Sequence, residues 1–110
     1  MDRYIFHIIR RGEWLEALER GDYVPASLSA EGFIHCSTAD QVAATAKRWY
    51  AGVADLVLLR IDTEQLAAEL KYEAPRNGGP ERQHERFPHL YGALNLDAVV
   101  EVLDLPRPGT

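Results

Sequence analysis

Histidines within apolar stretches are the residues of this sequence best suited to chemistry. His7 interrupts the apolar run from Tyr4 to Ile9, and His35 lies in a second apolar stretch, Gly32 to Cys36. An imidazole can act as an acid, a base or a ligand-orienting donor near neutral pH. A buried ring must satisfy both nitrogens, so each histidine is either such a functional group or a core residue bonded to a backbone carbonyl.

The neighbours His35 and Cys36 are not predicted to form a catalytic dyad. The two-residue period of a strand sends His35 to the face of Phe33 and Cys36 to the opposite face. A catalytic thiolate needs a nearby cation or helix N-terminus, and Cys36 does precede a predicted helix. Unpaired cysteines are more often small buried hydrophobes. We therefore take His35 as the candidate catalytic residue of this strand.

Glu73 and the segment from Phe87 to Gly92 supply the other candidates. Glu73 lies at the entrance to a loop, where a carboxylate can accept a proton, bind a ribose hydroxyl or simply be solvated. The segment combines two aromatic rings with His89 and is predicted to be either a rigid pocket wall or a turn that caps the core. Its Tyr91 is a candidate ligand-binding residue, as is His89.

Arginines are concentrated in the polar segment between Pro75 and Arg86, which is predicted to be a surface loop. Arg76, Arg82 and Arg86 can either clamp an anionic ligand or keep the loop hydrated. Metal ligation is a further possibility, and its potential ligands are His7, His35, His84, His89, Glu73 and Asp55. None of them has diagnostic spacing, and the sequence contains neither H-x-x-x-H nor C-x-x-C. No metal site is predicted.

The elements that position these residues follow from apolar periodicity. Strands are predicted at Tyr4–Ile9, Gly32–Cys36, Leu56–Ile61 and Ala98–Leu103, the third as a buried central strand. One helix carries Trp14 and ends at Gly21. A second is capped by Ser37 or Thr38, buries the face that includes Trp49, and ends at Gly52. A third, short helix carries Leu66 and Leu70. The predicted fold class is α+β.

Composition limits the number of domains and the classes of partner. The chain has 110 residues and 46% hydrophobic residues, enough for one core, so we predict one domain over 1–105 and a frayed tail over 106–110. The net charge of −5 disfavours extended nucleic-acid binding. The single cysteine suits a reducing compartment, and no run is long enough for a signal peptide or membrane span. We expect a cytoplasmic protein with no membrane partner.

Four segments together resemble one bacterial family, domain-of-unknown-function family 952. They are Phe6-His7-Ile8, Gly32-Phe33-Ile34-His35-Cys36-Ser37, the strand from Asp55 to Asp62, and Phe87-Pro88-His89-Leu90-Tyr91-Gly92. This resemblance implies a fold like that of ADP-ribosyltransferases, in which a small split antiparallel or mixed β-sheet, flanked by short helices, holds NAD in a cleft. By the same analogy, His7 contacts the adenosine-side ribose, and His35 or Ser37 faces the nicotinamide side.

The sequence departs from the transferase pattern at the late catalytic glutamate. Glu101 lies in an apolar strand without the usual companion motif. In that chemistry a carboxylate holds the nicotinamide ribose and stabilises the developing oxocarbenium ion. The resemblance therefore implies a degenerate or atypical ADP-ribosyltransferase, or a phosphotransferase, because the relation extends distantly to RNA 2′-phosphotransferases.

The leading hypothesis is a cleft that binds NAD, ADP-ribose or another small anionic ligand, with His35 and Glu73 as the catalytic candidates. The ligand-binding candidates are His7, Ser27, His35, Ser37, His89 and Tyr91. Two alternatives remain open. One is a non-catalytic interaction or ligand-binding module in which the histidines organise the core. The other is a small metal-dependent hydrolase. The sequence leaves the oligomeric state open.

Overall fold

The computed structural model describes residues 2–75 and 79–109. The helices are α1 (Arg11–Arg20), α2 (Ala26–Glu31) and α3 (Val42–Tyr50). The strands are β1 (Tyr4–Arg10), β2 (Asp22–Tyr23), β3 (Ile34–His35), β4 (Leu56–Asp62), β5 (Glu69–Glu73), β6 (Phe87–Tyr91), β7 (Leu94–Asn95) and β8 (Val99–Leu105). Short 3₁₀ turns lie at η1 (Thr63–Gln65), η2 (Pro80–Arg82) and η3 (Leu96–Ala98).

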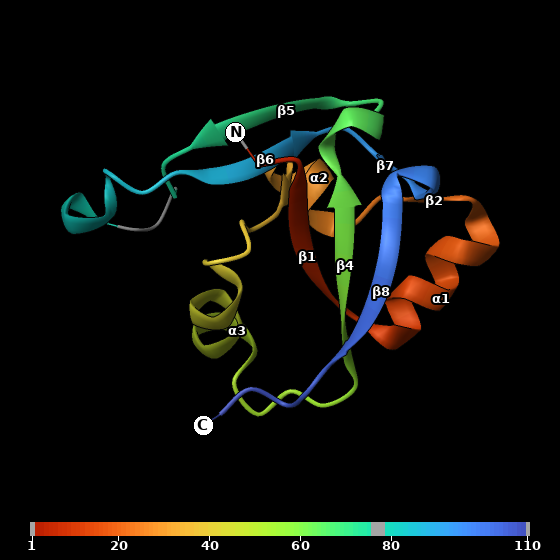
Figure 1. The fold of residues 1–110 in the computed structure, drawn as a ribbon, viewed down its shortest axis with the longest axis horizontal. Helices are drawn as coiled ribbons and strands as arrows, with labels where there is room; N and C mark the ends of the chain where they lie inside the picture. Colours follow the sequence, from red (N-terminus) through yellow and green to blue (C-terminus); the bar gives the residue numbers. More distant parts are fainter. Residues whose placement is uncertain (1, 76–78, 110) are drawn as a thin grey trace.

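The strands form small antiparallel sheets, which confirms the α+β class. One sheet has the order β1-β4-β8, a second has the order β3-β6-β5, and β2 pairs with β7. Every strand pair that the structure describes is antiparallel. In Figure 1, β5 and β6 cross one end of the β1-β4-β8 sheet, while α1 and α3 lie on opposite sides of it. The two larger sheets therefore meet at one end, and β2-β7 is a smaller third sheet.

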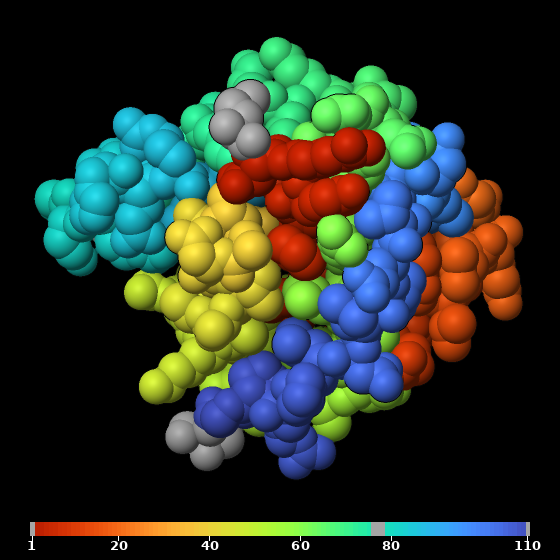
Figure 2. Space-filling view, viewed as in Figure 1, coloured from red at the N-terminus to blue at the C-terminus, as the bar shows by residue number. Residues whose placement is uncertain are grey.

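β4 is the buried central strand that the sequence predicts. It pairs with β1 on one edge and with β8 on the other. Val57, Leu59 and Ile61 alternate on one face and are fully buried in the main core. That core also takes Trp14 and Ala17 from α1, which ends at Gly21 as predicted, in a left-handed conformation. The opposite face of this sheet is less covered, and Figure 2 shows it recessed between β8 and the segment before α3.

The predicted strand over Gly32–Cys36 forms in part, because only β3 pairs as a strand. Its position is nevertheless fixed by both sheets. The N–H of Cys36 donates to the Pro88 carbonyl at 3.0 Å, and Phe6 and Ser37 exchange backbone hydrogen bonds at 2.8 and 2.7 Å. These bonds connect β1 to β6 through the segment that carries His35. A two-residue strand can therefore position a functional side chain.

The second predicted helix forms, but its first residue and its buried face differ from those expected. Thr38 N–H donates to the Gln41 side chain at 2.9 Å, but these residues form a turn and α3 begins at Val42. Ala46 is the buried residue of α3, while Trp49 is 64% exposed. The prediction that Trp49 is a core residue is wrong. Its ring lies at the rim of a cavity, where the surrounding elements leave it uncovered.

Two other segments differ from the sequence-based expectation. The residues around Leu66 form a 3₁₀ turn rather than a helix, with the Asp62 carboxylate accepting from the Glu64 N–H at 3.0 Å, and Leu70 belongs to β5. Helix α2 was not predicted. It is short and buries no residue, so it has little apolar periodicity to reveal it.

The segment after β5 begins the predicted loop, of which residues 76–78 lie outside the described part of the chain. The described remainder contains η2, and order continues into β6, so Phe87–Gly92 is largely a strand rather than a capping turn. In the predicted tail, the Pro108 carbonyl accepts from Gly52 N–H at 3.1 Å. Among the described residues, none of the helices combines the length and the apolar character needed to cross a membrane.

Candidate functional site

A cavity of about 780 Å³ opens between β1, β3, α2, α3 and the segment that leads into β6. Five of the predicted site residues contribute to its wall: His7, Ser27, His35, Ser37 and His89. Ligand pockets usually have volumes of roughly 300–1,000 Å³ and hold a few convergent polar groups among apolar ones. The cavity therefore has the size and composition of a small-molecule site.

His7 is buried, and both of its ring nitrogens are engaged within the protein. Nδ1 lies 2.6 Å from the carbonyl oxygen of His35, and Nε2 lies 3.0 Å from the Tyr23 hydroxyl. Burial lowers the pKa of His7 to about 4, so the ring is neutral at pH 7. His7 thus occupies the wall as a structural group, and its neighbour Tyr23 continues the hydrogen-bonded chain into the cavity lining.

His35 is the more exposed of the two predicted histidines. Its side chain is 53% exposed, and its Nε2 lies 3.0 Å from Glu31 Oε1 at the end of α2. As the strand period predicts, its ring lies on the face of Phe33, with ring centroids 4.7 Å apart. A carboxylate partner that accepts from a ring N–H fixes the orientation of an imidazole. His35 is therefore oriented by Glu31 and accessible from the cavity.

Glu73 forms a hydrogen-bonded cluster with two other predicted residues. His89 Nδ1 lies 2.9 Å from Glu73 Oε1, and the Tyr91 hydroxyl donates to the same oxygen. Tyr91 and then His89 hold the pKa of Glu73 below its usual range. His89 is buried and stacks on Phe33 with ring centroids 4.0 Å apart. Glu73 thus orients a buried imidazole in the cavity wall.

The remaining predicted residues differ in their access to the cavity. Ser27 is half-buried in the first turn of α2 and lines the cavity. Ser37 is buried there, and its hydroxyl donates to Thr45 Oγ1 at 3.3 Å. Tyr91 and Glu73 are not among the lining residues, so they reach the cavity only through His89. Of the predicted arginines, Arg82 lines it and pairs with Glu85, whereas Arg76 lies outside the described residues.

Cys36 lies in the wall as a buried, protonated thiol. It is 4% exposed, and burial raises its pKa to about 12. A thiol is nucleophilic only as the thiolate. This environment agrees with the prediction that Cys36 is a small buried hydrophobe and not a nucleophile.

Sequence reasoning missed several lining residues, of which those on α3 had a detectable signal. Gln41, Ala44, Thr45, Arg48 and Trp49 line the cavity. Their spacing of i, i+3, i+4, i+7 and i+8 describes one face of a helix. The expectation that Trp49 lies on the buried face of this helix conceals the pattern. Tyr23 and Glu13 carry no comparable signal, because their roles depend on tertiary contacts: α1 packs against β2, and Tyr23 bonds to His7.

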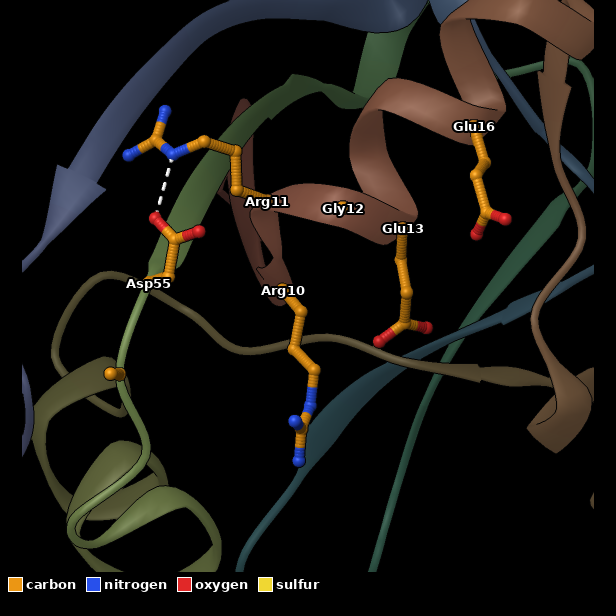
Figure 3. Close-up of a pocket in the computed structure, with 7 residues that line it drawn as sticks. Arg10, Arg11, Gly12, Glu13, Glu16 and Asp55 are labelled. Carbon is orange, nitrogen blue, oxygen red and sulfur yellow. Dashed lines mark hydrogen bonds and ion pairs between the residues drawn. The ribbon is translucent and has the colours of Figure 1, made fainter.

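Titratable residues in the described ranges do not form a metal-binding cluster. Over 2–75 and 79–109, no group of three His, Cys, Asp or Glu side chains is placed to hold a metal ion. A second, shallower depression of about 520 Å³ lies at the start of α1. Figure 3 shows that Arg11 there points towards Asp55, and the two form an ion pair at 2.9 Å. This depression has ion-paired walls and no histidine.

Comparison with known proteins identifies the family. The model of a family described as "Protein of unknown function (DUF952)" matches residues 8–102. The chain belongs to this family, which confirms the resemblance seen in the sequence.

Solved structures of one relative have the same fold. The crystal structure of protein CC0527 from Caulobacter crescentus is 39% identical, with a TM-score of 0.80 over 97% of this chain and 91% of that chain. Its solution NMR structure is 40% identical, with a TM-score of 0.78 over 96% of this chain and 86% of that chain. No curated protein matches the chain.

Proposed function

We propose that the cavity binds a small anionic ligand of the nucleotide class, with ADP-ribose and NAD as the first ligands to test. The observation that carries this proposal is a single cavity of about 780 Å³ that gathers five side chains predicted from four separate segments. Side chains that serve only the core need not share an opening. Their convergence on a ligand-sized space is what a binding site requires.

The charges of the wall suit a ligand that has both phosphates and hydroxyls. Its cations are Arg10, Arg48 and Arg82, and its carboxylates are Glu13, Glu31, Asp40 and Glu85. Arg82 is held by Glu85 and Glu31 by His35, whereas the Arg48 side chain makes no hydrogen bond or ion pair within the described part of the chain, and its charge acts on Glu85 without direct contact. A guanidinium that is not committed to a protein carboxylate can bind a phosphate in a bidentate manner. Carboxylates can accept from sugar hydroxyls.

An aromatic ring at the rim supports the same class of ligand. Trp49 is 64% exposed although it is one of the largest apolar side chains, and it lies one residue from Arg48 on the cavity-lining face of α3. An exposed tryptophan beside a pocket offers a flat surface for stacking. A base stacked on Trp49 would place its phosphates within reach of Arg48.

His35 is the residue we assign to proton exchange with a bound ligand, with Glu73 acting through His89. The basis is that His35 is both accessible and oriented by Glu31, whereas His7 has no ring nitrogen left for a ligand. Glu101, the only late-strand glutamate, pairs with Arg60 at 3.2 Å and does not line the cavity. The proposal is therefore binding first, with any ADP-ribosyl transfer atypical in mechanism, and the ADP-ribosyltransferase-like fold is part of the same proposal.

The rival functions make different predictions for the same cavity. A protein-interaction module would use the exposed side chains of the rim and gain no stability from a nucleotide. A metal-dependent hydrolase would be stabilised by a divalent ion, although the described residues offer no cluster for one. Ligands that bind only the folded state raise its melting temperature, so one assay separates the three.

The test is thermal unfolding with ADP-ribose, NAD or Zn²⁺, using variants that fill the cavity. Ala44 and Ala43 are both exposed on α3, but only Ala44 lines the cavity. At a concentration about a hundred times the Kd, the ligand should raise Tm by roughly 10 °C. We expect this shift in the wild type and in Ala43→Phe, and its loss in Ala44→Phe. No shift with any nucleotide, or an equal shift in both variants, would overturn the proposal.

A further inference from the structure

The hydrogen bonds of His7 determine which atom of Tyr23 is available to a ligand. A carbonyl oxygen can only accept, so the 2.6 Å contact with the His35 carbonyl requires a proton on His7 Nδ1. A neutral imidazole has one N–H, which leaves Nε2 as an acceptor. The Tyr23 hydroxyl, 3.0 Å away, must then donate its proton to Nε2. The Tyr23 oxygen then has only lone pairs to offer to a ligand.

Tyr23 therefore faces the cavity as an obligatory acceptor. The residue is 5% exposed, lines the cavity and has its hydroxyl held by a buried partner. Rotating this O–H towards a ligand would leave His7 Nε2 without a donor inside the core, which costs the desolvation of a buried polar atom. A ligand atom that meets the Tyr23 oxygen must consequently be a donor.

A second acceptor, the Glu13 carboxylate, lines the same cavity. Burial first, and then the Glu13 charge, raise the pKa of both Tyr23 and Tyr50, so the negative charge of Glu13 acts on the part of the cavity wall that these two tyrosines form. Figure 3 shows the Glu13 side chain extending from α1 to the same side as Arg10 and away from the pair of Arg11 and Asp55. The Glu13 side chain lines the cavity and makes no hydrogen bond or ion pair within residues 2–75 and 79–109.

We infer that Tyr23 and Glu13 form a subsite that selects a ligand group with two hydrogen-bond donors, either a pair of neighbouring hydroxyls or an amine. This inference rests on the proposed function and divides the cavity into two ends. Phosphates bind towards Arg48, while the end at Tyr23 and Glu13 disfavours anionic oxygens because the Tyr23 oxygen and the Glu13 carboxylate both offer only acceptors. A hydroxyl converted to a methyl ether keeps its oxygen but loses its proton, so it cannot bind there.

The principal test compares AMP with AMP whose 2′- and 3′-hydroxyls are both O-methylated, by calorimetry and NMR titration. Glu13→Gln replaces one acceptor oxygen by a donor, and Glu16→Gln is the matched control on the same helix because Glu16 does not line the cavity. Methylation should weaken wild-type binding about tenfold, and Glu13→Gln should weaken AMP binding to a similar extent. Glu13→Gln should leave the affinity for the methylated analogue unchanged. Glu16→Gln should bind like the wild type.

Tyr23→Phe gives a second measure of the same subsite. It removes the acceptor oxygen but also leaves His7 Nε2 unsatisfied, so its fold must be checked by circular dichroism before binding is measured. If the variant folds, it should lose the discrimination between AMP and its methylated analogue. If it does not fold, Glu13→Gln decides. Equal affinity of the wild type for AMP and the analogue would overturn the subsite while leaving nucleotide binding intact.

A fragment arm separates failure of the subsite from failure of the proposed function. If neither form of AMP binds at millimolar concentration, nucleotide binding is wrong, and the subsite is tested with cis-1,2-cyclopentanediol, its dimethyl ether and cyclopentylamine. Shifts of the Tyr23 and Glu13 resonances with the diol or the amine, but not with the ether, would support the subsite and distinguish its two classes of ligand. Shifts with none of the fragments, or with the ether as well, would refute it.

Discussion

The two larger sheets differ in what holds them together. In β1-β4-β8 the central strand is covered on both edges, and its inward side chains are apolar and fully buried. In β3-β6-β5 one face carries polar side chains: Glu73 is hydrogen-bonded to His89 and Tyr91, and the rings of His35, His89 and Tyr91 pack around Phe33. The first sheet is stabilised by burial, and the second holds polar groups in fixed positions. In this small fold, different sheets thus provide the stability and the polar groups suited to chemistry.

His7 is the point where the two sheets meet. It lies on β1 of the apolar sheet, yet its ring donates to the backbone of His35 on β3 and accepts from Tyr23 on β2. The same residue type therefore has opposite roles on neighbouring strands. His7 is a neutral buried connector, and His35 is an accessible group in the cavity wall.

The largest effect on stability should come from the β1-β4-β8 sheet. Leu59→Ala removes a fully buried side chain from β4 and should lower the free energy of unfolding by about 2–5 kcal/mol. Leu103→Ala, on the partly exposed face of β8, should cost less than about 1 kcal/mol. Urea denaturation monitored by tryptophan fluorescence measures both. Similar losses for the two variants would mean that burial does not dominate this sheet.

The second largest effect is the pH dependence caused by His7. Its folded-state pKa of about 4 is below the unfolded value near 6.5, so the unfolded chain binds more protons between these pH values. The stabilisation is complete above about pH 6.5 and is lost as the pH falls through 4. Between pH 7 and pH 4.5, His7 should remove roughly 2–3 kcal/mol of stability.

This contribution is isolated by comparing variants at the two pH values. His7→Gln cannot titrate and should show a correspondingly smaller loss of stability on acidification, even if it is less stable throughout. His84→Gln, an exposed residue in the segment before β6, should keep the full wild-type loss. Parallel profiles of stability against pH for the wild type and His7→Gln would show that the buried ring is not the origin of the pH dependence.

An intermediate effect tests the cavity wall on α3. Arg48 and Lys47 are adjacent, exposed and equally charged, but only Arg48 lines the cavity. Arg48→Ala should weaken ADP-ribose binding about tenfold through loss of a charge-assisted hydrogen bond. Lys47→Ala should stay within about twofold, because a more distant exposed charge is screened. Calorimetry measures both affinities, and equal losses would remove Arg48 from the site.

The smallest effect concerns the β3-β6-β5 sheet alone. Tyr91 is the main cause that holds the pKa of Glu73 down, followed by His89. Tyr91→Phe should therefore raise the Glu73 pKa towards its usual range. Carbon-13 NMR of the labelled carboxyl group measures this pKa. Tyr4→Phe serves as a control, since Tyr4 contacts Arg3 and Arg60 instead. An unchanged Glu73 titration in Tyr91→Phe would show that the hydroxyl does not stabilise the carboxylate.

The parts of the fold that the sequence predicts are those fixed by long apolar patterns. β4 and α1 follow from uninterrupted or helically spaced apolar residues, because burial dominates their stability. Helix α2 and the strand β2 are too short for a period to appear, and tertiary contacts determine them. Trp49 was misplaced because a helical apolar pattern does not distinguish a core from the rim of a cavity.

For the site, sequence reasoning identified residue types better than their partners. His35 and His89 were singled out as unusual among apolar neighbours, and both line the cavity. The pairing of Glu73 with His89 depends on the register of β5 against β6, which no local pattern specifies. Tyr23 was missed because its importance comes from one hydrogen bond to a ring 16 residues away. Such contacts are properties of the tertiary structure.

The tautomer of His7 tests the connection between the two sheets, and with it the acceptor character of Tyr23. A ¹⁵N correlation spectrum of the histidine rings at pH 7 resolves protonated from unprotonated ring nitrogens. For His7 we predict a protonated Nδ1 and an unprotonated Nε2, with a cross-peak pattern that disappears in His7→Gln. A protonated Nε2, or rapid exchange between the two tautomers, would contradict this arrangement of the cavity wall.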